Sequence, residues 1–222
     1  MSQHVTEIVY IPFKVGLDLE SGDAAKLLDE VLSLLAKHKG TTSINWGRQI
    51  ETPNVVQMVI GWNSVDDHKA FEQIPEFEPF IQNLSKCIAA PLTIILVKLP
   101  SIEPGANNPL LAPVTECINA FFPPEQSESE YASSFQRFRD EALEIPDMKA
   151  TALIGGWSIE THQHENLGEG VDGKLFTAFV GWPSVEAHLN FRKTEAFPKI
   201  TGHLRAGAKA VKVWHVAFKQ YK

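Results

Sequence analysis

Two histidines, His68 and His188, occur in the same local context and could act as acid–base groups. Each lies three residues after a valine and three residues before a phenylalanine, so on a helix these side chains share one face. A histidine with apolar neighbours can take up or release a proton near neutral pH. Alternatively, both are core histidines that hydrogen-bond a strand or a loop and stabilise the fold.

Two glutamates, Glu7 and Glu116, form a second pair that could transfer protons. Each follows a Val-Thr pair in a β-rich run and lies on the apolar side of that run. A carboxylate on an apolar face needs a partner or a raised pKa. Either these residues are general bases that line a barrel, or they lie near water or in buried ion pairs, with Arg48 as a candidate partner.

These residues belong to an internal repeat. The segment from Gly61 to Phe71 recurs as Gly181 to Phe191, with an offset of 120 and with Gly, Trp, Ser, Val, His and Phe identical in both. Near the start of each repeat the offset is 109, because Val-Thr-Glu ends at Glu7 and again at Glu116. The two offsets differ by 11 residues, which predicts an insertion in the second repeat within residues 161–173.

Residues that differ between the repeats are candidates for binding a substrate, because a site that evolves after duplication distinguishes the two halves. Aromatic rings with a few polar groups suit a pocket for a planar, oxygen-bearing molecule. Core packing is the alternative explanation, above all for tryptophans on strands and for His215. The candidates are Tyr10 (Asn119 in the other repeat), Trp46 (Gly155), Arg48 (Trp157), Trp157 itself and His215 (Ile95).

Each repeat is predicted to have the element order β-α-β-β-α-β of the ferredoxin-like fold, and the chain is α+β. The first long helix is expected to begin at Ser21 as N-cap and to close at Gly40, and the short helices to start at Ser64 and Ser184. We predict the first repeat in residues 1–100, a linker in 101–112 and the second repeat in 113–222. The predicted strands cover residues 5–13, 41–51, 55–62 and 92–99, and then 114–122, 150–160, 174–182 and 211–218.

Helices cover only one face of such a sheet, yet strands such as residues 55–60 are apolar on both sides. We therefore expect the two repeats to cover each other's open sheet face as an intramolecular dimer.

The pattern Trp-x-Ser-Val-x-x-His-x-x-Phe after a glycine-ended strand resembles the dimeric α+β barrel superfamily, and most closely its antibiotic-biosynthesis-monooxygenase branch. Stress-responsive α+β barrel proteins are near relatives. The resemblance covers nearly all of both repeats. It implies either an enzyme without a bound cofactor or a barrel without catalytic activity, since members differ widely in function. Some relatives bind haem through one histidine, and small barrels of this type often self-associate, so a homodimer is a further expectation.

Composition excludes several other classes of protein. The net charge of −7, with no Lys/Arg run longer than two, argues against a nucleic-acid partner. No apolar stretch approaches the roughly 20 residues of a membrane helix. Nothing resembles a secretory signal, and Cys87 and Cys117 lie in apolar contexts, so we expect free thiols and a cytoplasmic location. His162 and His164 lack a third metal ligand at a characteristic spacing, so no metal is expected.

The sequence therefore favours a small-molecule enzyme of aromatic, polyketide-like secondary metabolism. Its substrate would be hydrophobic and carbonyl-bearing, and the reaction would be oxygenation, cyclisation or isomerisation through an enolate. The alternative is a non-catalytic barrel with a ligand-binding or stress-related structural role. A cavity lined by the candidate residues would favour the enzyme, and a solid core would favour the alternative.

Overall fold

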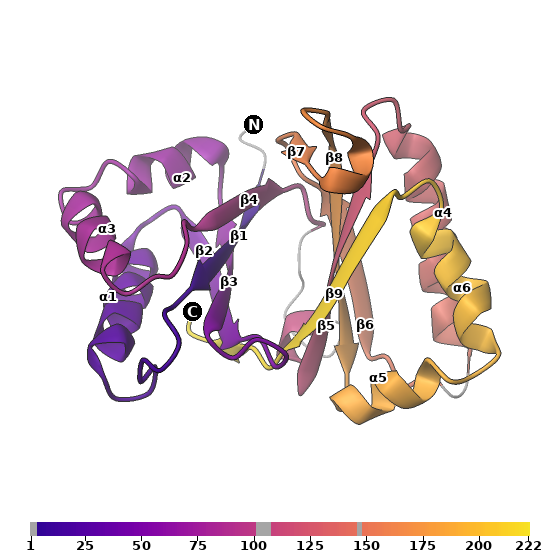
Figure 1. Ribbon diagram of the computed structural model, residues 1–222, viewed down its shortest axis with the longest axis horizontal. Helices are drawn as coiled ribbons and strands as arrows, with labels where there is room; N and C mark the ends of the chain where they lie inside the picture. Colours follow the sequence, from indigo (N-terminus) through magenta and orange to yellow (C-terminus); the bar gives the residue numbers. More distant parts are fainter. Residues whose placement is uncertain (1–3, 101–107, 146–147) are drawn as a thin grey trace. The chain divides into compact units, whose positions relative to one another are not determined.

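The computed structural model describes residues 4–100, 108–145 and 148–222 and separates into two compact units. The first unit comprises the chain up to Lys98 together with Phe218–Lys222, and the second comprises Leu99–Ala217. Within each unit the helices lie on one face of an antiparallel sheet (Figure 1). The predicted α+β class and the two ferredoxin-like repeats are confirmed. That the open sheet faces cover each other stays a prediction.

In the first unit the four strands of the repeat form the order β2-β3-β1-β4, and the C-terminal strand β10 (Lys219–Gln220) pairs with β2 at the edge. The repeat pattern gave no sign of this fifth strand, which comes from the far end of the chain. The elements are β1 (Val5–Pro12), α1 (Asp23–Lys37), β2 (Thr41–Arg48), β3 (Val55–Trp62), α2 (Val65–Phe71), α3 (Phe77–Ser85) and β4 (Thr93–Val97).

The second unit repeats this arrangement with the strand order β6-β8-β5-β9. Its elements are the 3₁₀ helix η1 (Pro109–Leu111), β5 (Val114–Phe122), α4 (Glu128–Glu144), β6 (Ala152–Trp157), β7 (His162–Gln163), the 3₁₀ helix η2 (Glu165–Leu167), β8 (Asp172–Trp182), α5 (Val185–Phe191), α6 (Ala196–Arg205) and β9 (Ala210–Val216). The extra residues of this unit form β7, η2 and the start of β8. Among the described residues no helix is long and apolar enough to cross a membrane.

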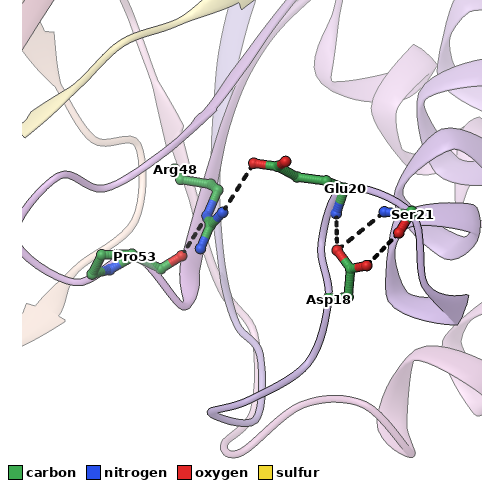
Figure 2. A network of polar contacts seen from close by, with 5 residues as sticks. All are labelled: Asp18, Glu20, Ser21, Arg48 and Pro53. Carbon is green, nitrogen blue, oxygen red and sulfur yellow. Dashed lines mark hydrogen bonds and ion pairs between the residues drawn. The ribbon is translucent and has the colours of Figure 1, made fainter.

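Helix starts follow the predicted serines in the two short helices. Ser64 accepts a hydrogen bond from the Asp67 N–H, and Ser184 accepts one from the Ala187 N–H, each at 3.1 Å. The prediction for α1 was wrong, because Gly22 rather than Ser21 is its N-cap. The Ser21 hydroxyl instead donates to the Asp18 carboxylate, which also accepts the Ser21 backbone N–H (Figure 2). These hydrogen bonds lower the pKa of Asp18.

Gly155 in β6 provides a test of the packing that distinguishes the two units. It occupies the place of Trp46, and a Cβ atom there would lie 2.6 Å from the ring of Phe176 and 2.8 Å from that of Phe135. Gly155→Ala should therefore lower the free energy of unfolding by about 1–3 kcal/mol, because rings in a packed core cannot yield easily.

A matched control for Gly155→Ala is Gly202→Ala, in the exposed part of α6 where an added Cβ meets nothing within 4 Å. This change should raise the free energy of unfolding by about 0.5–1 kcal/mol, since alanine loses less backbone entropy than glycine in a helix. Urea unfolding of both variants makes the comparison. Equal shifts would contradict the proposed ring contact at Gly155.

Candidate active site

A cluster of glutamate, tryptophan and histidine occurs once in each unit. In the first unit, Trp62 Nε1 donates to Glu7 Oε2 at 2.9 Å, and His68 Nε2 lies 3.3 Å from Glu7 Oε1. In the second unit, Trp182 Nε1 donates to Glu116 Oε2 at 2.9 Å, and His188 Nε2 lies 3.5 Å from Glu116 Oε1. All six side chains are buried. The residues that the sequence singled out in pairs are thus in contact within each unit.

The repeat motif explains why these side chains meet. Glu116 lies on the helix-facing side of β5, two residues after Val114, and Val114 pairs with Trp182 at the end of β8. The chain then turns into α5, whose N-cap Ser184 places His188 one helical turn later, above the same end of the sheet. The ring of His188 stacks on Trp182 with centroids 4.9 Å apart. Strand register and helix cap together therefore bring the carboxylate and the imidazole together.

His215 extends this cluster in the second unit only. It pairs with Glu116 in the β5–β9 register, and its Nε2 lies 2.8 Å from His188 Nδ1, which is a hydrogen bond. The residue that pairs with Glu7 in the first unit is Leu96. The sequence comparison had matched His215 with Ile95, which is one residue away and on the other face of its strand. The repeat offset is 119 in this strand, so the predicted correspondence was wrong by one position.

The helix-facing side of the second unit contains a cavity of about 230 Å³, which we call the second-unit cavity. Glu116 and His188 lie on its wall, and Val213, which is 41% exposed, lies where it meets solvent. The corresponding space of the first unit, lined by Glu7 and His68, is only about 60 Å³. The remaining lining residues of the larger cavity are Ile118, Phe138, Met148, Trp182, Phe191, Arg192, Phe197, Ile200, Thr201, Leu204, Arg205 and Val211.

Glu116 has the electrostatic properties of a base that works near neutral pH. Burial raises the pKa of its carboxyl from 4.5 to about 7, because the apolar wall disfavours the charged form. The Trp182 hydrogen bond and the nearby positive charge of Arg192 oppose this rise in the pKa only in part. At neutral pH the carboxyl is therefore divided between its two protonation states, as an efficient general acid–base group requires.

His215 and four other predicted residues lie outside the linings of both cavities. Tyr10 is on the strand face opposite Glu7, and Trp46 lies under the Lys219 ammonium at 5.3 Å. The Trp157 ring packs among the rings of Phe122, Tyr131 and Phe176.

Arg48, the fourth of these residues, is bound to neighbouring groups of the first unit. Its Nε donates to the Pro53 carbonyl at 2.7 Å, and its Nη1 lies 3.8 Å from a Glu20 carboxylate oxygen (Figure 2). Its role and those of Tyr10, Trp46 and Trp157 in substrate binding stay predictions.

The extra segment of the second unit holds its histidines apart from the cavity. His162 Nε2 hydrogen-bonds Ser158 Oγ at 2.7 Å, and burial lowers the pKa of His162. The His164 ring packs against the Phe121 ring with centroids 4.4 Å apart and planes tilted by 40°. Within the parts of the chain that the structure describes, no three His, Cys, Asp or Glu side chains are placed to hold a metal ion.

Two arginines at the cavity, Arg192 and Arg205, were missed by the sequence analysis. A signal was available, since the repeat offset of 120 matches Arg192 with Glu72 and Arg205 with Ser85.

No protein-family model matches the sequence, and no curated protein matches it. Solved structures do match. An anthrone oxidase-like protein has a TM-score of 0.70 and 13% identity over 99% of this chain and 94% of its own. The likeness is one of fold.

Two further structures come from proteins named for a proposed monooxygenase activity. The one from Fusobacterium nucleatum has a TM-score of 0.62 and 10% identity over 99% of this chain and 94% of its own. The one from Lactobacillus acidophilus has a TM-score of 0.58 and 9% identity over 100% of this chain and 95% of its own. These matches span both units, and at 9–13% identity they show a likeness of fold alone.

Proposed function

We propose that the second unit is an enzyme that binds an apolar, carbonyl-bearing aromatic molecule and forms its enolate with Glu116 as the base. The observation that carries the proposal is a carboxyl with a pKa of about 7 on the wall of a cavity lined mainly by apolar side chains. Cavities of about 150 Å³ accept benzene, so 230 Å³ has room for more than one ring. The names of the similarly folded proteins, monooxygenase and anthrone oxidase-like, support chemistry on aromatic ketones.

In the first step, the Glu116 carboxylate takes a proton from the carbon beside the substrate carbonyl, and the electron pair of that C–H bond becomes the enolate. The neutral acid that results is the form that burial favours. His188 Nε2, 3.5 Å from Glu116 Oε1, can accept the proton from it and return it. His215 holds the other nitrogen of His188 and so sets which nitrogen carries hydrogen.

The enolate has three outcomes that need no bound cofactor. Return of the proton to another carbon is isomerisation, and attack on a second carbonyl carbon is cyclisation. With O₂ as co-reactant, the enolate carbon forms a C–O bond, and the resulting peroxide anion takes the proton back from Glu116 to become a hydroperoxide. We favour oxygenation among the three, because the similarly folded proteins carry oxidase and monooxygenase names.

The corresponding cluster of the first unit has a different role in this proposal. Glu7 and His68 have nearly the same geometry as their counterparts, but their cavity of about 60 Å³ is much smaller than the roughly 150 Å³ of a cavity that accepts benzene. We therefore infer that Glu7, Trp62 and His68 stabilise the fold, which for His68 is the alternative explanation given in the sequence analysis.

The test is deuterium exchange into the methyl group of 2-acetylnaphthalene, an apolar aromatic ketone, followed by proton NMR in D₂O. The protein should accelerate exchange above the rate in buffer, because exchange requires only enolate formation. An unchanged exchange rate at saturating protein would contradict the proposal. Oxygen consumption without exchange would mean that the reaction does not begin with enolate formation.

His215 is a positioning residue, since it acts on the cavity through His188. His215→Leu, which copies Leu96 of the first unit, should lower the exchange rate by roughly tenfold. The pH midpoint of the rate should also move upward, because His188 loses the hydrogen bond that holds it against Glu116 and so stabilises the Glu116 carboxylate less. His215→Gln, which retains a hydrogen-bonding group, should restore most of the rate. A lower rate with an unchanged pH midpoint in both variants would show that His215 contributes to packing and does not position His188.

A further inference from the structure

The mouth of the second-unit cavity carries two positive charges. Arg192 follows the last residue of α5 and Arg205 is the last residue of α6, and both line the cavity and are exposed to solvent. The Arg192 guanidinium lies 5.7 Å over the Phe197 ring, a cation–π contact that holds it at the wall. We call Arg192 and Arg205 the rim arginines.

The rim arginines are available to a ligand. Within the described ranges, neither guanidinium has a carboxylate within 4.0 Å, whereas Arg48 in the first unit lies 3.8 Å from Glu20. A guanidinium without an ion pair, next to an apolar hollow, can bind a carboxylate through two parallel hydrogen bonds. The free donors thus lie where a ligand would enter.

The two units differ in charge at this position. Glu72 of the first unit occupies the place of Arg192, lines the smaller cavity, and has a carboxylate oxygen 3.9 Å from His68 Nε2. Ser85 occupies the place of Arg205, since α3 and α6 contribute matching residues to the two cavities at the same offset. One copy of the duplicated hollow is therefore acidic and small, and the other is basic and large.

From these observations we infer that the second-unit cavity binds an aromatic acid, whose carboxylate lies at the rim arginines and whose rings lie among the apolar side chains. This inference rests on the proposed function for the identity of the site and adds the substrate class. The acidic group orients the rings, so that a carbonyl on them is presented to Glu116 at the inner wall. A neutral ketone would enter with less preference for one orientation.

The test compares two ligands with the same ring system, 2-naphthoate and 2-acetylnaphthalene, by isothermal titration of the full chain at low salt. Naphthoate should bind about tenfold more tightly than the ketone, and salt should weaken its binding. Arg192→Glu and Arg205→Ser, which introduce the residues of the first unit, should each lower naphthoate affinity about tenfold and leave ketone affinity within about twofold. Arg192→Gln serves as a second variant if Arg192→Glu does not fold.

Lys193→Glu is the matched control, because Lys193 is exposed next to Arg192 but is absent from the cavity lining. It should leave naphthoate binding within about twofold of the wild-type value. Equal affinity for the two ligands, equal losses in Lys193→Glu and Arg192→Glu, or no naphthoate binding would each overturn the inference. If the protein accelerates deuterium exchange into the ketone but binds naphthoate no more tightly, the proposed function is retained and the acid-binding inference is not. Tight naphthoate binding without ketone exchange would leave only the acid-binding site.

Discussion

Glu116→Gln is expected to lower the rate of deuterium exchange into 2-acetylnaphthalene by about 10²- to 10⁴-fold, the usual contribution of a positioned general base. Glutamine has the same shape and still accepts the hydrogen bond from Trp182 Nε1, so the loss would isolate the proton transfer. In the wild-type protein the rate should rise with pH through about 7, because the carboxylate is the active form.

Glu7→Gln is the control for this experiment, since Glu7 has the same partners in the first unit but lines only the smaller cavity. Its rate should stay within about twofold of the wild-type rate. Equal losses of rate in both variants would contradict the assignment of the reaction to the second unit. They would mean either that both units react or that neither glutamate is the base. Wild-type activity in Glu116→Gln would contradict the proposed base directly.

The same carboxyl should make the protein less stable as the pH rises. Because its pKa is about 7 in the folded protein and 4.5 as an ordinary carboxyl, the folded state binds more protons than the unfolded state between these values. The stabilisation from the protonated form is complete below about pH 4.5 and is lost as the pH rises through about 7. The free-energy difference is about 3 kcal/mol.

Glu116→Gln should therefore have nearly the wild-type free energy of unfolding at about pH 4.5, and about 3 kcal/mol more at about pH 8. Urea unfolding at both pH values measures the difference. Glu169→Gln, which removes an exposed carboxylate of the same unit, should differ from wild type by less than about 0.5 kcal/mol at both values. A pH-independent difference for Glu116→Gln would mean that the carboxyl is not raised in pKa.

These two expectations have one physical origin. A base buried in an apolar wall is reactive because its charged form is poorly solvated, and for the same reason it lowers the stability of the folded protein at neutral pH. In the first unit, where the hollow is nearly filled, Glu7 and its partners are better explained as structure. The duplication would thus have allowed one copy to stabilise the chain and the other to acquire a cavity, His215 and the rim arginines.

The repeat and its element order were determined by the sequence. Hydrophobic alternation in strands and caps such as Ser64 are local signals, so the order of elements and the face of Glu7 and Glu116 could be predicted. The match of Trp46 with Gly155 is confirmed, because their strand partners, Met58 and Ala178, are matching residues of the two repeats. The match of Arg48 with Trp157 is confirmed in the same way by their partners Val56 and Phe176.

Only the tertiary structure decided which side of the sheet is hollow and which copy contains the larger hollow. A cavity is the volume left over by side chains from several elements, and no local pattern reports it. The same holds for His215, which reaches His188 because β9 pairs with β5 in a register shifted by one residue from the repeat. Alternation along one strand tells which residues share a face, but the contacts across that face depend on how strands and helices pack together.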